Sequence, residues 1–179
     1  MIGGHEQLIN VVQGDFEISD KPDVILTTVL GSCVAVCLHD PVRQIGGMNH
    51  FLLPYGDSGG DGSGVSMRYG TYAMELLING LLKQGARKER LQAKIFGGAR
   101  MNEKLRDIGS SNAAFAREFL AEENIPIVGE SLSGKAARRI RMWPMTGRVR
   151  QLLVENPTEV PVERPVAVPR KPQEDITLF

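Results

Sequence analysis

The sequence predicts an α/β protein in which helices pack on a mixed β-sheet. Short runs rich in valine, isoleucine and leucine predict strands before, between and after two stretches with helical spacing of apolar residues. The order of elements is therefore strands, helix, strand, helix and strands, which also allows a second sheet layer. The chain has 179 residues, of which 42% are hydrophobic and 23% charged, so it is long enough for one buried core.

The first predicted strands contain both cysteines of the chain. Residues 24–30 and 34–38 are nearly continuous apolar runs, and residues 45–53 predict a third strand. Asp40-Pro41 is a turn-forming pair between the second and third strands. We therefore expect these three segments to form a small antiparallel sheet.

Two helices follow in the sequence. Apolar residues at steps of three and four predict a helix over residues 69–81, and Gly85 stands where such a helix would end. A second helix is expected over residues 112–124, begun by Ser110 or Ser111. The remaining predicted strands are residues 91–96, 125–128, 138–143 and 148–154, the last two joined by a hairpin turn at residues 145–147.

Two segments lack the composition of a core. Residues 56–64, "GDSGGDGSG", predict a loop, because none of their side chains can build a core. Five of the ten prolines fall after residue 155, and proline is excluded from helix interiors and central strands. We therefore expect one domain over residues 1–154 and a proline-rich extended tail over residues 155–179.

Charge and hydropathy exclude several classes of partner. Twenty-one basic and 21 acidic side chains give a formal net charge of zero, which provides no overall field to attract nucleic acid. The longest uncharged run, residues 24–39, is shorter than the roughly 20 apolar residues of a bilayer span, so no direct membrane insertion is expected. The N-terminus lacks the pattern of a signal peptide, and two cysteines four apart fit a reducing compartment. These features predict a cytoplasmic protein.

Cys33 is a candidate nucleophile and His50 a candidate base. A cysteine attacks only as a thiolate and therefore needs a base or a positive charge nearby. A hairpin centred near residue 42 would place Val34 opposite His50 and bring His50 beside Cys33. That register leaves the two side chains on opposite faces, so we expect a one-residue bulge at Gly46-Gly47 to bring them to one side.

Neighbouring residues could supply the other parts of a catalytic site. Gly31 permits a tight turn in which backbone N–H groups near Gly31, Ser32 and Cys33 hold a developing oxyanion. Thr27 or Thr28 could orient the imidazole with a hydroxyl group.

The alternative interpretation is that Cys33 and His50 are ordinary core residues. Free cysteine is among the most buried residue types, and local features leave the two interpretations evenly balanced. Cys37, between Val36 and Leu38 in a strand, is expected to be core only.

Three other patterns are weaker signals of a functional site. "GESLSGKA", residues 129–136, lacks the final hydroxyl residue of a phosphate-binding loop, because Ala136 stands there. His5, His39 and Asp40 have no metal-ligand spacing, so no metal or cofactor is expected. Residues 135–150 hold six basic and no acidic side chains, which favours a solvated strand face over a contact for an acidic helical substrate.

The sequence resembles the CheD family of chemoreceptor glutamine deamidases from about residue 14 to residue 154. The segments that carry the resemblance are "TTVLGSCVAVCLHDP", "GGMNHFLLP", "KIFGGARM", "IGSSN" and "SGKAARRIRMWPMTGRV", in that order. The resemblance implies an α/β/β sandwich with two main helices and a mixed, largely antiparallel sheet. It also implies a catalytic triad, which falls on Cys33, His50 and Thr27.

The resemblance further implies a reaction and its partners. The expected enzyme is a cysteine-dependent amidohydrolase that converts glutamines on the cytoplasmic helical bundle of chemotaxis receptors to glutamate. Some members of the family also bind a chemotaxis phosphatase of the CheC type. Two other functions stay open, namely receptor methylester hydrolysis at the same thiol and a non-catalytic binding module. Serines in "IGSSN", where relatives often carry charged residues, and the tail depart from the family pattern without touching the triad.

Overall fold

The computed structural model describes residues 4–54, 63–104, 107–155 and 162–163. The predicted glycine-rich loop lies outside the described residues except for residues 63 and 64. The predicted tail lies outside them except for residues 155, 162 and 163. No helix of the described residues is long and apolar enough to cross a membrane.

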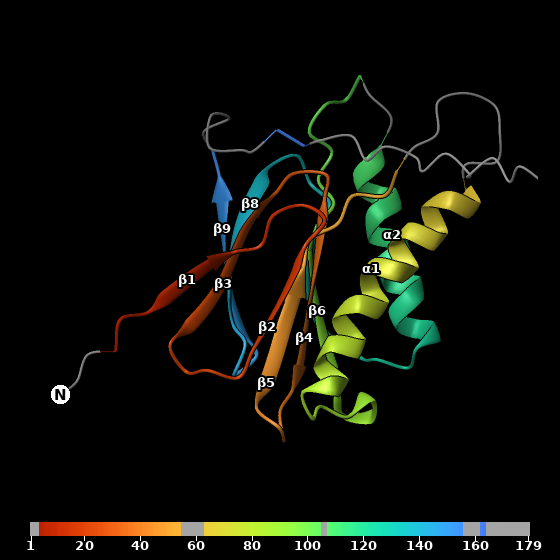
Figure 1. Cartoon of the computed structure of the whole chain (residues 1–179). Coiled ribbons are helices and arrows are strands. Elements are labelled where there is room, and N and C mark those ends of the chain that lie inside the picture. The colour runs from red at the N-terminus through yellow and green to blue at the C-terminus, as the bar shows by residue number, and fades with distance from the viewer. Residues whose placement is uncertain (1–3, 55–62, 105–106, 156–161, 164–179) are drawn as a thin grey trace, which may run out of the picture.

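The described residues form two sheets and a pair of helices in three layers (Figure 1). One sheet has the strand order β1 (Gln7–Asn10), β3 (Val24–Leu30), β8 (Ala137–Trp143) and β9 (Arg148–Val154). The other has the order β2 (Phe16–Ser19), β5 (Ile45–Asn49), β4 (Val34–Asp40), β6 (Gln92–Gly97) and β7 (Ile127–Leu132). The helices are α1 (Ser63–Lys83) and α2 (Ile108–Glu122), with a short 3₁₀ helix, η1 (Lys88–Arg90), before β6.

Strand β4 shows how the two hydrophobic cores are separated. Val34, Val36 and Leu38 point to one side and belong to the core beneath α1 and α2. Cys33, which precedes the strand, and Cys37 point to the other side, into the core between the two sheets. Because side chains alternate along a strand, one apolar run fills both cores. The predicted α/β/β sandwich is confirmed, and among the described strands only β1–β3 and β6–β7 are parallel neighbours.

Some predicted elements differ from the observed ones. Strands β1 and β2 were not predicted, because β1 is largely exposed and β2 is only four residues long, so neither has a strong apolar run. Helix α2 begins at Ile108, whereas Ser110 or Ser111 was expected to begin it. Its N-cap is Asp107, whose side chain accepts a hydrogen bond from the Ser110 N–H. Strand β5 ends at Asn49 rather than residue 53.

The register of the β4–β5 hairpin differs by one residue from the prediction. Cys37 pairs with Met48, and the same register continues to an isolated bridge between Val34 and Phe51. The predicted bulge at Gly46-Gly47 is absent from the ladder. Both glycines are needed for close packing instead, since an added Cβ would lie 2.6 Å from Pro144 O at Gly46 and 2.8 Å from Glu17 O at Gly47.

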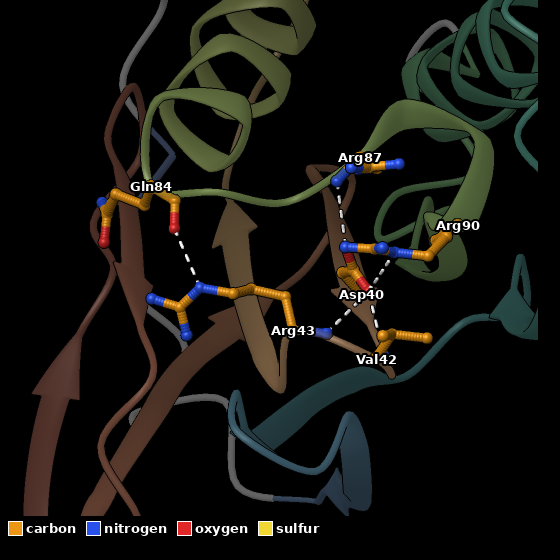
Figure 2. A network of polar contacts seen from close by, with 6 residues as sticks. All are labelled: Asp40, Val42, Arg43, Gln84, Arg87 and Arg90. Carbon is orange, nitrogen blue, oxygen red and sulfur yellow. Dashed lines mark hydrogen bonds and ion pairs between the residues drawn. The ribbon is translucent and has the colours of Figure 1, made fainter.

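A buried carboxylate holds the turn of this hairpin (Figure 2). Asp40 is fully buried, and its Oδ1 accepts hydrogen bonds of 3.0 Å from the N–H groups of Val42 and Arg43. Its Oδ2 accepts from the Arg87 N–H at 2.9 Å and from the Arg90 guanidinium at 2.8 Å. Asp40 therefore connects the hairpin to the segment between α1 and β6.

Candidate active site

Cys33 lies in the short turn between β3 and β4, where hydrogen bonds from the end of β6 and from α2 hold the backbone. The three carbonyls of the turn each accept a hydrogen bond: Gly31 O from Ala99 N at 3.0 Å, Ser32 O from Asn112 Nδ2 at 2.9 Å, and Cys33 O from Gly98 N at 2.8 Å. With its carbonyls engaged in this way, the turn presents the Cys33 N–H toward the opposite side, where a carboxylate accepts it. The local structure therefore fixes the direction of a backbone donor as well as the position of the thiol.

Two residues that hold this turn were not identified as site residues from the sequence. Gly97 has φ of 111°, and a Cβ built on it would lie 2.1 Å from Cys33 O, so only glycine fits. Asn112 is fully buried in α2, and its Oδ1 accepts from the Leu53 N–H at 3.0 Å. A signal for Asn112 did exist, since it is a polar residue on the same helix face as the buried Ala116 and Phe119.

His50 and Cys33 lie on the same face of the five-stranded sheet. Val34 and Phe51 are paired across the hairpin, and both pack in the core beneath the helices. The residues just before them, Cys33 and His50, therefore face the other sheet, because side chains alternate along strands. The backbone of His50 is anchored by Asp15 O, which accepts from its N–H, and by the Gly14 N–H, which donates to its carbonyl. The register therefore places both side chains on one face without a bulge.

The hydroxyl that contacts His50 belongs to Thr28. Thr28 Oγ1 is 2.8 Å from His50 Nδ1, whereas Thr27 Oγ1 donates to Ile140 O at 2.9 Å on the other side of β3. Thr28 shares its face of the strand with Leu26 and Leu30, which are in the core between the sheets. The contact that was expected of Thr27 is therefore made by its neighbour.

The contacts of His50 indicate its tautomer. Thr28 Oγ1 donates to Val11 O at 2.7 Å, so its lone pairs are the groups that face the imidazole. His50 Nδ1 also lies 3.1 Å from Val11 O, which can only accept a hydrogen bond. We therefore assign the proton to Nδ1. Nε2 is then unprotonated and available as a base.

Burial keeps both reactive groups in their neutral forms. The pKa of Cys33 is raised far above its ordinary value, first by burial and then by the negative charge of Glu163 and a hydrogen bond to it. The pKa of His50 is lowered by burial, against the opposing effects of Val11 O and Glu163. The resting pair is therefore a thiol and a neutral imidazole, and thiolate forms only when His50 accepts the proton.

A cavity of about 770 Å³ opens onto His50 and onto Gly31 of the Cys33 turn. Its lining includes Thr28, Gly31 and His50, together with Arg139 and Arg141 of β8. The Cys33 N–H and the Ser32 hydroxyl both donate to the Glu163 carboxylate there. The predicted oxyanion turn therefore lies beside a space large enough for a side chain of a partner protein. Gln13 also lines the cavity, and its Oε1 is 3.9 Å from Cys33 Sγ.

The other sequence patterns have structural roles in the described residues. His39 Nε2 contacts Met145 O at 3.0 Å, and Asp40 forms the ion pair with Arg90. Within the described ranges, no three histidine, cysteine, aspartate or glutamate side chains gather as a metal site. Residues 129–136 lead from β7 into β8 rather than into a helix, so they do not form a phosphate-binding loop.

Comparisons with known proteins place the sequence in a family. The family model described as CheD chemotactic sensory transduction matches residues 52–152. A protein of Caulobacter sp. (strain K31), described as a probable chemoreceptor glutamine deamidase CheD, is 55% identical over 96% of this chain and 92% of its own length. A protein of Rhizobium etli with the same description is 48% identical over 96% of this chain and 95% of its own length.

A solved structure was also found, the Bacillus licheniformis hypothetical protein YfiH, with a TM-score of 0.42 and 15% identity over 71% of this chain and 60% of that chain. The family model and the curated relatives together cover the Cys33 turn, His50, and Gly97 and Gly98, which pack against that turn. The chain belongs to the CheD family.

Proposed function

We propose that the protein is a chemoreceptor glutamine deamidase that hydrolyses the side-chain amide through a thioester on Cys33. The descriptions of the relatives support the reaction and the substrate class. The observation that carries the mechanism is the arrangement around His50. Its Nδ1 is held by Thr28 and Val11 O, which leaves Nε2 free on the face it shares with Cys33.

The proposed reaction has two halves. In the first, His50 Nε2 takes the thiol proton, Cys33 Sγ attacks the amide carbon, and the oxyanion is held by the Cys33 N–H and the Ser32 hydroxyl. The imidazolium then gives its proton to the departing ammonia, and a thioester remains. In the second half, His50 activates water, the C–S bond breaks, and the glutamate product leaves with the thiol restored. Each step uses groups of this chain and water.

The cavity supports a proposal for receptor docking. Arg139 and Arg141 line it, and they would attract an acidic helical substrate to this cavity. The cytoplasmic helical bundle of the receptor is the proposed docking partner. Binding of a CheC-type phosphatase stays a prediction.

Mass spectrometry of a receptor fragment tests the function. After incubation, the wild-type protein and Cys37→Ser are expected to convert glutamine to glutamate, while Cys33→Ser is inactive, because only Cys33 has the base and the oxyanion donors. His50→Ala should be inactive and His39→Ala active, with circular dichroism checking that both are folded. Loss of a methyl group instead would indicate an esterase, and unchanged mass with binding would indicate a non-catalytic module. Activity of Cys33→Ser would refute the proposed nucleophile.

A further inference from the structure

A carboxylate of the C-terminal segment occupies the oxyanion site. Glu163 Oε1 accepts a hydrogen bond from the Cys33 N–H at 3.1 Å, and its Oε2 accepts one from the Ser32 hydroxyl. A Cβ added to Gly31 would lie 2.7 Å from Oε1, so the carboxylate lies directly against the turn. Val162 and Glu163 both line the active-site cavity. No pattern in the sequence predicted this contact.

The chemistry of this residue matches the product of the proposed reaction. Deamidation of a glutamine side chain yields a glutamate side chain, with the same carbon skeleton and the same planar end. In the proposed mechanism, the Cys33 N–H and the Ser32 hydroxyl stabilise the oxygen of the reacting carbonyl. Glu163 places a carboxylate oxygen on each of these donors. Its position is therefore the one that a newly formed glutamate of the receptor would hold before release.

We propose that Glu163 is a product mimic carried by the chain itself, which competes with the receptor side chain for the Cys33 pocket. This inference rests on the proposed deamidase function and adds to it an inhibitory ligand in cis. While the carboxylate is bound, the oxyanion donors are occupied, and the side-chain carbonyl of a receptor glutamine cannot reach them. The enzyme acts on the receptor only when Glu163 has left the pocket.

The contacts fit a reversible ligand rather than a permanent part of the site. Val162 is 90% exposed, so the side chain next to Glu163 adds little buried apolar surface. Charge-assisted hydrogen bonds from Cys33 and Ser32 are then the main described attachment. A docked receptor can compete for these donors.

The carboxylate also disfavours the reactive form of the cysteine. Burial is the largest cause of the raised pKa of Cys33, and the charge of Glu163 raises it further. Departure of Glu163 therefore both empties the oxyanion site and makes the thiol easier to ionise.

Substitution of Glu163 by glutamine turns the mimic into a substrate in cis. In full-length Glu163→Gln, Cys33 Sγ can attack the new side-chain amide, the C–N bond breaks and ammonia leaves, and water then cleaves the thioester. Peptide mass spectrometry is expected to find residue 163 as glutamate in this variant. The Glu163→Gln/Cys33→Ser double variant should keep the amide. Glu155→Gln, an exposed position of the same segment, should also keep its amide.

The outcomes separate the two proposals. An amide retained at residue 163, in an enzyme that deamidates a receptor fragment, would overturn the product mimic and leave the function standing. A protein that converts neither substrate would overturn both.

Steady-state kinetics give a second, independent readout. Glu163→Ala is expected to lower the KM for a receptor fragment about three- to tenfold with kcat unchanged, because a larger fraction of the enzyme has an open site. Glu155→Ala should leave KM as in the wild type. An unchanged KM in Glu163→Ala would rule out competition between Glu163 and the receptor.

Discussion

At the scale of single residues, the proposed catalytic chemistry depends on hydrogen bonds that orient the imidazole of His50. Thr28 donates to Val11 O and accepts from His50 Nδ1, so one hydroxyl determines which imidazole nitrogen is left as the base. A neutral hydroxyl orients the ring, but it stabilises an imidazolium less than a carboxylate would. The contribution of Thr28 is therefore mainly to geometry.

Substitutions of the two threonines test this role. Thr28→Ala is expected to lower the deamidation rate by roughly ten- to a thousandfold, less than the loss of a buried carboxylate orienter. Thr28→Ser keeps the hydroxyl and should recover most of the rate, which a purely structural role would not require. Thr27→Ala should lose little, because in the described residues its hydroxyl donates to Ile140 O and does not contact His50. Initial rates at matched folded fractions decide the matter, and a larger loss for Thr27 would reverse the assignment.

At the scale of elements, the candidate active site is formed by close backbone packing. The turn between β3 and β4 lies against the end of β6, where Gly98 N and Ala99 N bond its carbonyls. Helix α2 adds the amide of Asn112 to the same turn. Two elements that are distant in sequence from the turn thus position Cys33, and each approach requires a small residue or a buried polar one.

Gly97 offers the sharpest test of this packing. Gly97→Ala is expected to destabilise the protein by about 2–4 kcal/mol, because the residue has a positive φ and its Cβ would overlap Cys33 O. Gly129→Ala in β7 is the matched control, since its nearest contact would be Lys94 Cγ at 3.4 Å, and it should change stability by less than about 1 kcal/mol. Denaturant unfolding measures both, and equal effects would contradict the described contact.

At the scale of the whole molecule, one buried carboxylate connects the β4–β5 hairpin to the segment between α1 and β6. Asp40 anchors the turn of the β4–β5 hairpin to the region of Arg87 and Arg90. Burial by itself would raise the pKa of Asp40. Hydrogen bonds from Arg90 and from the N–H groups of Arg43, Arg87 and Val42 outweigh burial, so the pKa lies well below its ordinary 3.8.

The depressed pKa of Asp40 gives a stability prediction with a defined sign. Its contribution to stability is present above the ordinary value of 3.8 and is lost as the pH falls toward the lower folded-state value. Asp40→Asn should therefore be about 2–4 kcal/mol less stable at neutral pH, with the difference shrinking below pH 3.8. Asp20→Asn, which removes an exposed partner of Arg43, should cost less than about 1 kcal/mol. Unfolding free energies over the pH range test this, and a pH-independent difference would contradict it.

The sequence by itself determined the α/β class, both helices, most of the strands and the candidates Cys33 and His50. These features follow from apolar periodicity and from a short motif in which glycine, serine and cysteine follow a strand. The second sheet layer of the α/β/β sandwich was implied by the resemblance to the CheD family. The facing of Thr27 and Thr28 could not be read locally, because apolar residues occupy both faces of β3.

Only the tertiary structure decided the remaining features. The hairpin register depends on a turn whose last residue, Gln44, has a positive φ of 56°, which local patterns did not indicate. The roles of Asn112 and Gly97 depend on contacts with a turn that is distant in the sequence. The same holds for Glu163, since a single carboxylate in a proline-rich segment has no periodicity, and only folding brings it to Cys33.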